Sequence, residues 1–252
     1  MTRRSLVVPA VALLVLTACA PAAEPATERE LTIFAAASLQ GAFDRLAAEL
    51  EQRNPGVTVA PVTYDGSSTL ATQLVGGASA DVFASADLVT MATVVDAGLA
   101  VGEPAVVATN TLQIAVEPGN PLRIASLADV AELADSGGKV VLCAAQVPCG
   151  SAARAVLDGA GLALTPVSEE QNVKAVLTKV QTGDADAGLV YRTDVLAAGP
   201  EVEGVDFPEA ASAVNEYPVV VLADGDAARA FVDLALSADG RRILADAGFG
   251  PP

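Results

Sequence analysis

Four short segments of this chain combine small residues and serines with the start of an apolar helical pattern, and together they could bind an anion. They are residues 35–39, 66–70, 147–151 and 171–174. The first turn of a helix has unpaired N–H groups and a partial positive charge. Several such turns that meet at one point would therefore bind an anion without any charged side chain. A fifth segment, residues 188–191, is typical of a buried strand that ends in a phenol hydroxyl.

Each of these residues also has an ordinary structural explanation. Ser38 and Ser67 stand before apolar helical patterns, where serine often caps a helix. Asn172 can cap the helix that carries Val173, and Val173 itself would usually belong to a core. Tyr191 can be a core tyrosine that donates to a backbone carbonyl. It is their joint placement that favours a binding site.

The composition argues for binding rather than catalysis. The chain has no histidine, which excludes a histidine base and histidine metal ligands. A serine nucleophile needs an adjacent base, and no Ser-x-x-Lys stands in the segments above. We therefore expect no catalytic residue, no cofactor and no site for a free metal cation.

The charge balance excludes another class of partner. Lysine and arginine number 14 against 31 aspartates and glutamates, a net charge of −17. Such a chain repels nucleic acid and anionic lipid surfaces, so neither is expected as a partner. A buried anion site is less affected, because salt screens distant charges while local dipoles act at short range.

The N-terminal residues are typical of an export signal. Arg3 and Arg4 precede an apolar run over residues 6–16 that is too short to span a bilayer. The following Leu-Thr-Ala-Cys resembles the lipobox of bacterial lipoproteins, in which the chain is cut before the cysteine and Cys19 receives lipid. This implies a signal peptide over residues 1–18, with a plain cleaved signal as the alternative. Residues 19–29 lack apolar periodicity, which predicts a flexible tether.

Two further cysteines remain in a chain that is expected to be exported. Cys143 and Cys149 form an even pair, so a disulfide is the default interpretation, with two buried thiols as the alternative. The spacing is not Cys-x-x-Cys, which argues against a redox-active pair.

The apolar pattern alternates between strand and helix along the chain. Strands are expected over 31–35, 57–62, 81–84, 112–116, 140–143, 187–191 and 217–222. Helices are expected over 39–50, 70–75, 88–95, 127–133, 151–157 and 169–180, with two more within 227–247. This is an α/β pattern with helices on both faces of parallel or mixed sheets, and such folds bind ligands beyond the carboxyl ends of their strands.

The pattern restarts near residue 112, which predicts two lobes joined by two crossings. Lobe 1 would contain residues 30–111 and 217–252, and lobe 2 would be inserted between them over 112–216. Two lobes joined in this way form a hinge with a ligand cleft between them.

Taken in order, several motifs resemble the substrate-binding proteins of bacterial molybdate ABC importers. These motifs are Phe-Ala-Ala-Ala-Ser-Leu at 34–39, Ser-Ser-Thr-Leu at 67–70, Ala-Asp-Val-Phe-Ala-Ser-Ala-Asp at 80–87, Val-Pro-Cys-Gly at 147–150, Val173, Gly-Leu-Val-Tyr at 188–191 and Glu-Tyr-Pro-Val at 216–219. The resemblance implies the type II periplasmic-binding-protein fold.

The resemblance also implies roles for single residues. The hydroxyls of Ser38, Ser67 and Tyr191 would donate to molybdate or tungstate. Backbone N–H groups near Ser38 and at Ser67, Cys149 and Val173 would complete the shell.

Two positions, Cys149 and Asp65, depart from that pattern. Family members often have alanine or another small residue where Cys149 stands; if this position contributes only its backbone N–H, a disulfide to Cys143 could fix the loop without blocking the site. Asp65 lies two residues before Ser67 and, turned inward, would repel a dianion or accept the proton of a monohydrogen anion such as phosphate. A turn or cap role facing water is favoured instead.

The resulting expectation is a monomeric, non-catalytic, extracytoplasmic lipoprotein that touches the membrane through its lipid and delivers the anion to a membrane permease. Alternatives are a receptor for another oxyanion such as sulfate or phosphate, a sensing lipoprotein without a transport role, and an extracytoplasmic enzyme.

Overall fold

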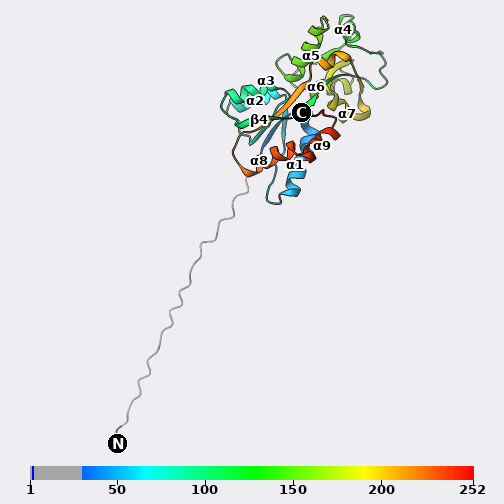
Figure 1. Cartoon of the computed structure of the whole chain (residues 1–252). Coiled ribbons are helices and arrows are strands. Elements are labelled where there is room, and N and C mark those ends of the chain that lie inside the picture. The colour runs from blue at the N-terminus through cyan, green and yellow to red at the C-terminus, as the bar shows by residue number, and fades with distance from the viewer. Residues whose placement is uncertain (1, 3–29) are drawn as a thin grey trace.

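The computed structural model describes Thr2 and residues 30–252 (Figure 1). The expected signal peptide, Cys19 and the tether lie outside the described residues. Within the described part, no helix is both long and apolar enough to cross a membrane.

The described residues form two five-stranded sheets, with strand orders β2-β1-β3-β10-β4 and β7-β6-β8-β5-β9. We call the part built on the first sheet lobe 1 and the part built on the second sheet lobe 2. The strands of lobe 1 are β1 Ile33–Ala36, β2 Thr63–Asp65, β3 Val82–Ala84, β4 Val101–Asn110 and β10 Asn215–Val221. Those of lobe 2 are β5 Leu112–Val116, β6 Val140–Cys143, β7 Ser168–Glu170, β8 Ala187–Tyr191 and β9 Glu203–Val205.

Helices cover both faces of the lobe 1 sheet. Successive side chains of a strand point to opposite sides, and in β1 both sets are apolar, so each face needs a cover. Ile33 packs in a core with α1 Gln40–Arg53, α8 Asp226–Leu236 and α9 Ala238–Asp246. Phe34, the next residue, packs in a separate core with α2 Ser67–Val75 and α3 Leu88–Asp96. Figure 1 shows these two groups of helices on different sides of lobe 1.

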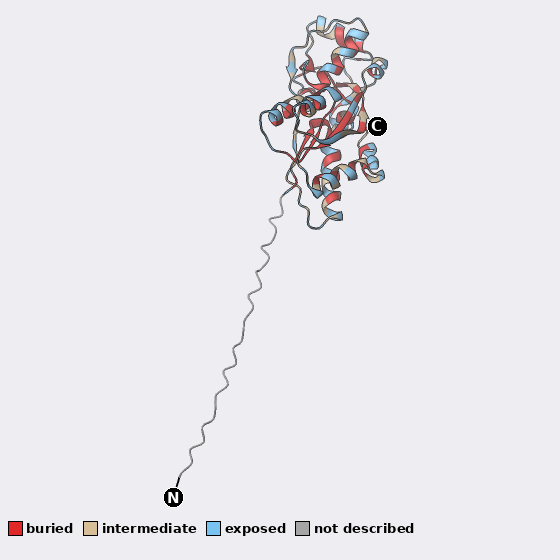
Figure 2. Cartoon of the chain, turned by 60° about the vertical axis from the view of Figure 1, so that its left-hand side comes forward, coloured by how far each residue is buried: buried red, intermediate tan, exposed pale blue. Residues whose placement is uncertain are grey.

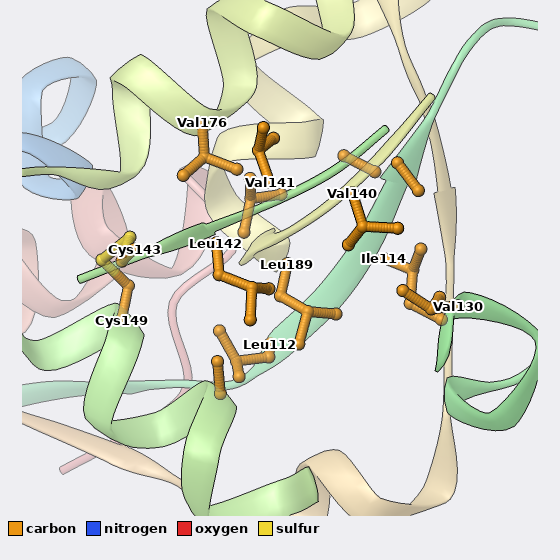
Figure 3. Packing of buried hydrophobic residues seen from close by; sticks show 14 of the residues in the cluster. Leu112, Ile114, Val130, Val140, Val141, Leu142, Cys143, Cys149, Val176 and Leu189 are labelled. Atoms are coloured by element: carbon orange, nitrogen blue, oxygen red, sulfur yellow. A yellow bond between two sulfur atoms is a disulfide. The ribbon is translucent and has the colours of Figure 1, made fainter. Parts of the chain in front are cut away.

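Lobe 2 has one continuous core. Its helices are α4 Leu127–Asp135, α5 Pro148–Gly159, α6 Val173–Gln181 and α7 Arg192–Ala198. In Figure 3, Val141 and Val176 lie on one side of β6, while Leu142 and Leu189 lie on the other. Buried residues concentrate in the strands and inner helix faces of both lobes (Figure 2).

The chain crosses between the two sheets at neighbouring points. It leaves the first sheet after Asn110, the last residue of β4, and enters the second at Leu112. It returns with β10, whose first residue Asn215 pairs with Asn110 in antiparallel register. The two crossings therefore lie side by side at the edge of lobe 1.

Two of the expected elements are wrong in part. The expected strand over 57–62 contains Pro61, and only an isolated bridge joins Val59 to Leu31, while ladder pairing begins at Thr63. The expected helix over 169–180 begins only at Val173, because Ser168–Glu170 pairs with β6 as strand β7.

Candidate functional site

The five predicted ligand residues line one pocket between the two lobes. Ser38 and Ser67 come from lobe 1, and Cys149, Val173 and Tyr191 come from lobe 2. The other lining residues are Ala36, Ala37, Asp65, Gly66, Ala86, Pro148 and Asn172. No lysine or arginine lines this pocket, so an anion there would be bound by hydroxyl and N–H donors.

Ser38 does not cap a helix as the sequence suggested. It lies in a short 3-10 turn, Ala37–Leu39, and Leu39 precedes α1 without a side-chain cap. The Ser38 Oγ is instead 2.9 Å from the hydroxyl of Tyr217 in β10. This contact holds the serine at the carboxyl end of β1, where its side chain faces the pocket.

Ser67 is the first residue of α2 and is almost fully buried. Its Oγ accepts a hydrogen bond from the backbone N–H of Ala86, at 2.9 Å. Because an N–H already occupies one lone pair of this oxygen, the hydroxyl hydrogen is free to point into the pocket. Ser67 is therefore prepared as a donor.

Two helix starts of lobe 2 face the same pocket. Cys149 is the second residue of α5, after Pro148, which has no N–H to donate. Val173 is the first residue of α6, and the Asn172 side chain caps that helix by accepting from the N–H of Ala175 at 3.0 Å. First-turn N–H groups lack partners within their own helix, so both helices offer donors and a favourable dipole to an anion.

The predicted disulfide is present between Cys143 and Cys149 (Figure 3). It joins the end of β6 to the first turn of α5 across the connecting loop. Gly150 packs so tightly in this turn that a Cβ there would lie 1.9 Å from the carbonyl oxygen of Ala144. The bond and the close packing both fix the loop that carries the Cys149 N–H.

Tyr191 ends β8 with a buried side chain, and its hydroxyl lacks a hydrogen-bond partner among the described residues. Burial raises the pKa of this phenol well above its ordinary value, so the hydroxyl keeps its proton and can donate it to an acceptor. A buried polar group without a partner is costly, about 1–3 kcal/mol. An acceptor in the pocket would remove that cost.

A hydrogen bond to the backbone N–H of Tyr191 helps to orient this residue within lobe 2. The Tyr191 N–H donates to the carboxylate of Asp194 at 3.1 Å, and Lys174 forms an ion pair with the same buried carboxylate at 3.0 Å. Burial raises the pKa of Asp194, while Lys174 opposes that rise. This pair links the strand end of Tyr191 to the first turn of α6.

Tyr217 contacts a pocket residue, although the sequence assigned it no role. Its fully buried hydroxyl lies between Ser38 and Asn110, whose amide nitrogen is 3.4 Å away. The same amide nitrogen donates to Thr193 of lobe 2 at 2.8 Å, and the Thr111 N–H donates to its carbonyl oxygen. The fixed amide donates to the Tyr217 hydroxyl, which can in turn donate to Ser38 and leave the serine proton for the pocket.

Burial also raises the pKa of the Tyr217 phenol, so this hydroxyl keeps its proton as well. The Glu-Tyr-Pro-Val motif at 216–219 could have drawn attention to Tyr217. Its contact with Ser38 could not be predicted from the sequence, because the two residues are 179 positions apart.

Comparison with known proteins identifies the family to which this chain belongs. The family model for bacterial extracellular solute-binding proteins matches residues 31–250. The chain is 49% identical to the molybdate-binding protein ModA of Mycobacterium tuberculosis over 238 residues, which cover 93% of this chain and 90% of that protein.

Solved structures share the fold at lower identity. The periplasmic molybdate-binding protein of Azotobacter vinelandii has a TM-score of 0.73 at 21% identity, covering 88% of this chain and 100% of that one. The sulfate-binding protein SubI of Mycobacterium tuberculosis has a TM-score of 0.75 at 18% identity, with 88% and 86% covered. These likenesses confirm the type II periplasmic-binding-protein fold, and the family match over nearly all described residues establishes that this chain belongs to the bacterial extracellular solute-binding proteins.

Proposed function

We propose that this protein is an extracytoplasmic receptor that captures molybdate, and also tungstate, and delivers it to the membrane permease of an ABC importer. Lobes 1 and 2 would close on the anion through the two adjacent crossings. The ligands would be the hydroxyls of Ser38, Ser67 and Tyr191 and the backbone N–H groups at Ser67, Cys149 and Val173. The 49% identity to a molybdate-binding relative supports this ligand.

The observation that carries the proposal is the buried Tyr191 hydroxyl, which faces the pocket without a partner among the described residues. With Ser38 and Ser67 it forms a set of donors that come from both lobes. A fully deprotonated tetrahedral dianion has acceptor lone pairs on every oxygen and satisfies such a set. Monohydrogen phosphate would direct its own proton at one of these donors, an unmatched contact that costs about 1–3 kcal/mol. Asp65 also lines the pocket and would remove this cost if its free carboxylate oxygen accepted that proton, so thermal melting with phosphate tests this preference directly.

The fold alone does not indicate which oxyanion is bound, because a sulfate-binding protein has the same fold. Sulfate has the same charge as molybdate but shorter bonds, so converging donors that fit the larger anion would lie too far from its oxygens. Size is therefore the property by which this site would reject sulfate.

The proposal includes the export and the anchor inferred from the N-terminal sequence. Cys19 would be the lipidated first residue of the mature protein, and residues 19–29 would tether a monomeric receptor to the outer surface of the cell membrane. Two acyl chains hold a protein stably at a membrane. The receptor would catalyse no reaction, in keeping with a chain that has no histidine.

Thermal melting with a panel of oxyanions tests the ligand. A ligand that binds only the folded state stabilises it by RT ln(1 + [L]/Kd), about 2.7 kcal/mol at a hundredfold excess over Kd. At equal concentrations molybdate and tungstate should raise the melting temperature most, sulfate less and phosphate least. A phosphate shift as large as the molybdate shift would overturn the proposed ligand, and unchanged molybdate uptake after gene deletion would overturn the transport role.

A further inference from the structure

The Asp65 carboxylate lies in the pocket lining, where its charge opposes an anion. The sequence favoured a turn or cap role facing water. The structure instead places Asp65 half-buried at the end of β2, where its Oδ1 accepts a hydrogen bond from the Asn172 amide of lobe 2 at 2.8 Å. These two residues are 107 positions apart and come from opposite lobes.

Each partner is oriented by its own lobe. The Asn172 carbonyl oxygen accepts from the Ala175 N–H, so the amide nitrogen is the end that faces Asp65. The Asp65 Oδ1 also accepts from the N–H of Gly66 at 2.7 Å. Since each group also has a hydrogen bond within its own lobe, the contact between them would cost little side-chain entropy as the lobes come together.

The backbones of the two lobes also touch at this place. A Cβ on Gly66 would lie 2.1 Å from the carbonyl oxygen of Gln171, so only glycine allows this approach. Asp65 and Gly66 directly precede Ser67, and Gln171 and Asn172 directly precede Val173. The contact thus holds together two segments that each present ligand donors.

We infer that the Asp65–Asn172 hydrogen bond is a closure latch, which forms when the lobes close and sets how long the anion stays bound. This inference rests on the proposed function. The latch would position Ser67 and Val173, which closely follow the residues that form it. It acts after capture, so it controls the dissociation rate, whereas a residue that attracts the anion would control the association rate.

Stopped-flow measurement of molybdate binding and displacement tests this role in the purified protein. The chain has three tyrosines and no tryptophan, and Tyr191 lines the pocket, so tyrosine fluorescence reports occupancy. Asp65→Ala should raise the dissociation rate about tenfold, equivalent to about 1.4 kcal/mol, and leave the association rate within about twofold. Unchanged or slower dissociation would show that Asp65 acts only as a repelling charge and would overturn the latch.

Asp44→Asn is the matched control. Asp44 accepts from the Tyr64 hydroxyl at 2.8 Å within lobe 1, so this variant also removes one negative charge but breaks no contact between lobes. Its dissociation rate should equal that of the wild type. An equal acceleration in both variants would assign the effect to charge alone and would overturn the latch.

A swap of the two partners gives a second, independent test. Asn172→Asp keeps an acceptor for the helix cap but sets two carboxylates against each other, so dissociation should be fastest in this variant. The double variant Asp65→Asn with Asn172→Asp restores a donor and an acceptor and should restore most of the wild-type residence time. Absence of such rescue would overturn the latch, whereas absence of molybdate binding in the wild type would refute the proposed function instead.

Discussion

Two serines of the pocket are oriented by hydrogen bonds to other groups of the protein. The Ser67 oxygen accepts from Ala86, and the Ser38 oxygen is fixed by Tyr217. The N–H donor leaves the Ser67 hydroxyl hydrogen for the ligand, and the Ser38 hydrogen is free in the same way when Tyr217 is the donor of their shared hydrogen bond. Preorganisation of this kind lowers the entropy lost on binding.

Removing a serine donor should therefore weaken binding strongly. A hydrogen bond to a charged group contributes about 1.5–3 kcal/mol, so Ser67→Ala should raise the molybdate Kd by roughly ten- to a hundredfold. Ser68→Ala is the control, because its hydroxyl is buried, has no hydrogen-bond partner among the described residues and does not line the pocket. Calorimetric titration measures both, and full affinity in Ser67→Ala would remove that serine from the site.

Tyr217→Phe tests the orienting role of a residue outside the pocket lining. The Ser38 hydroxyl would lose its donor and could turn its own proton away from the anion. We expect a weaker effect than from Ser38→Ala, a several-fold increase in Kd with the Ser67 contribution intact. An affinity equal to that of the wild type would show that Ser38 is oriented without Tyr217.

The residue types of the site could be predicted from the sequence, but their partners could not. Asn172 caps α6 as expected, because capping depends only on neighbours in the sequence. The contacts Ser38–Tyr217 and Asp65–Asn172 span 179 and 107 positions, and only the packing of the sheets brings them together.

At the scale of elements, buried strands were easier to predict than edge strands. The strands β6 and β8 occur over the expected residues, since both are buried and apolar throughout. The long strand β4 and the short β7 were not expected. Both lie at sheet edges, and β4 contains Gly102 and Pro104 while β7 is the polar sequence Ser-Glu-Glu. Edge strands tolerate such residues, so their sequences resemble loops.

The stability and position of the first turn of α5 should depend on the Cys143–Cys149 disulfide. A bond that closes so short a loop contributes about 2 kcal/mol in the chain-entropy model. Cys143→Ser with Cys149→Ser should lower the melting temperature and weaken molybdate binding several-fold, because the Cys149 N–H loses its fixed position. Intact mass before and after reduction checks that the bond exists, and two free thiols in the unreduced, unfolded protein would contradict it.

At the scale of the whole molecule, closure depends on how near the lobes can approach. Gly66 has φ −58° and ψ 133°, an ordinary conformation for any residue, so alanine would not strain lobe 1 itself. Its Cβ would instead meet Gln171 of lobe 2. Gly66→Ala should therefore lower the affinity for molybdate more than tenfold and leave the melting temperature of the ligand-free protein unchanged.

Gly56→Ala is the control for this prediction, because a Cβ at Gly56 would meet nothing within 4 Å. Calorimetry gives the Kd and thermal melting gives the stability of each variant. Wild-type affinity in Gly66→Ala would mean that the anion is bound without the close approach of the two lobes.

Asn110 pairs with Asn215 in the first sheet, so lobe 2 is inserted into lobe 1 at a single place. Lobe 2 begins and ends at adjacent residues of one antiparallel ladder, so its removal would leave two strand ends that a short hairpin turn can join. All five strands of the first sheet would keep their neighbours. After such a deletion we expect the remainder to fold as a single lobe that presents Ser38 and Ser67 on an open surface.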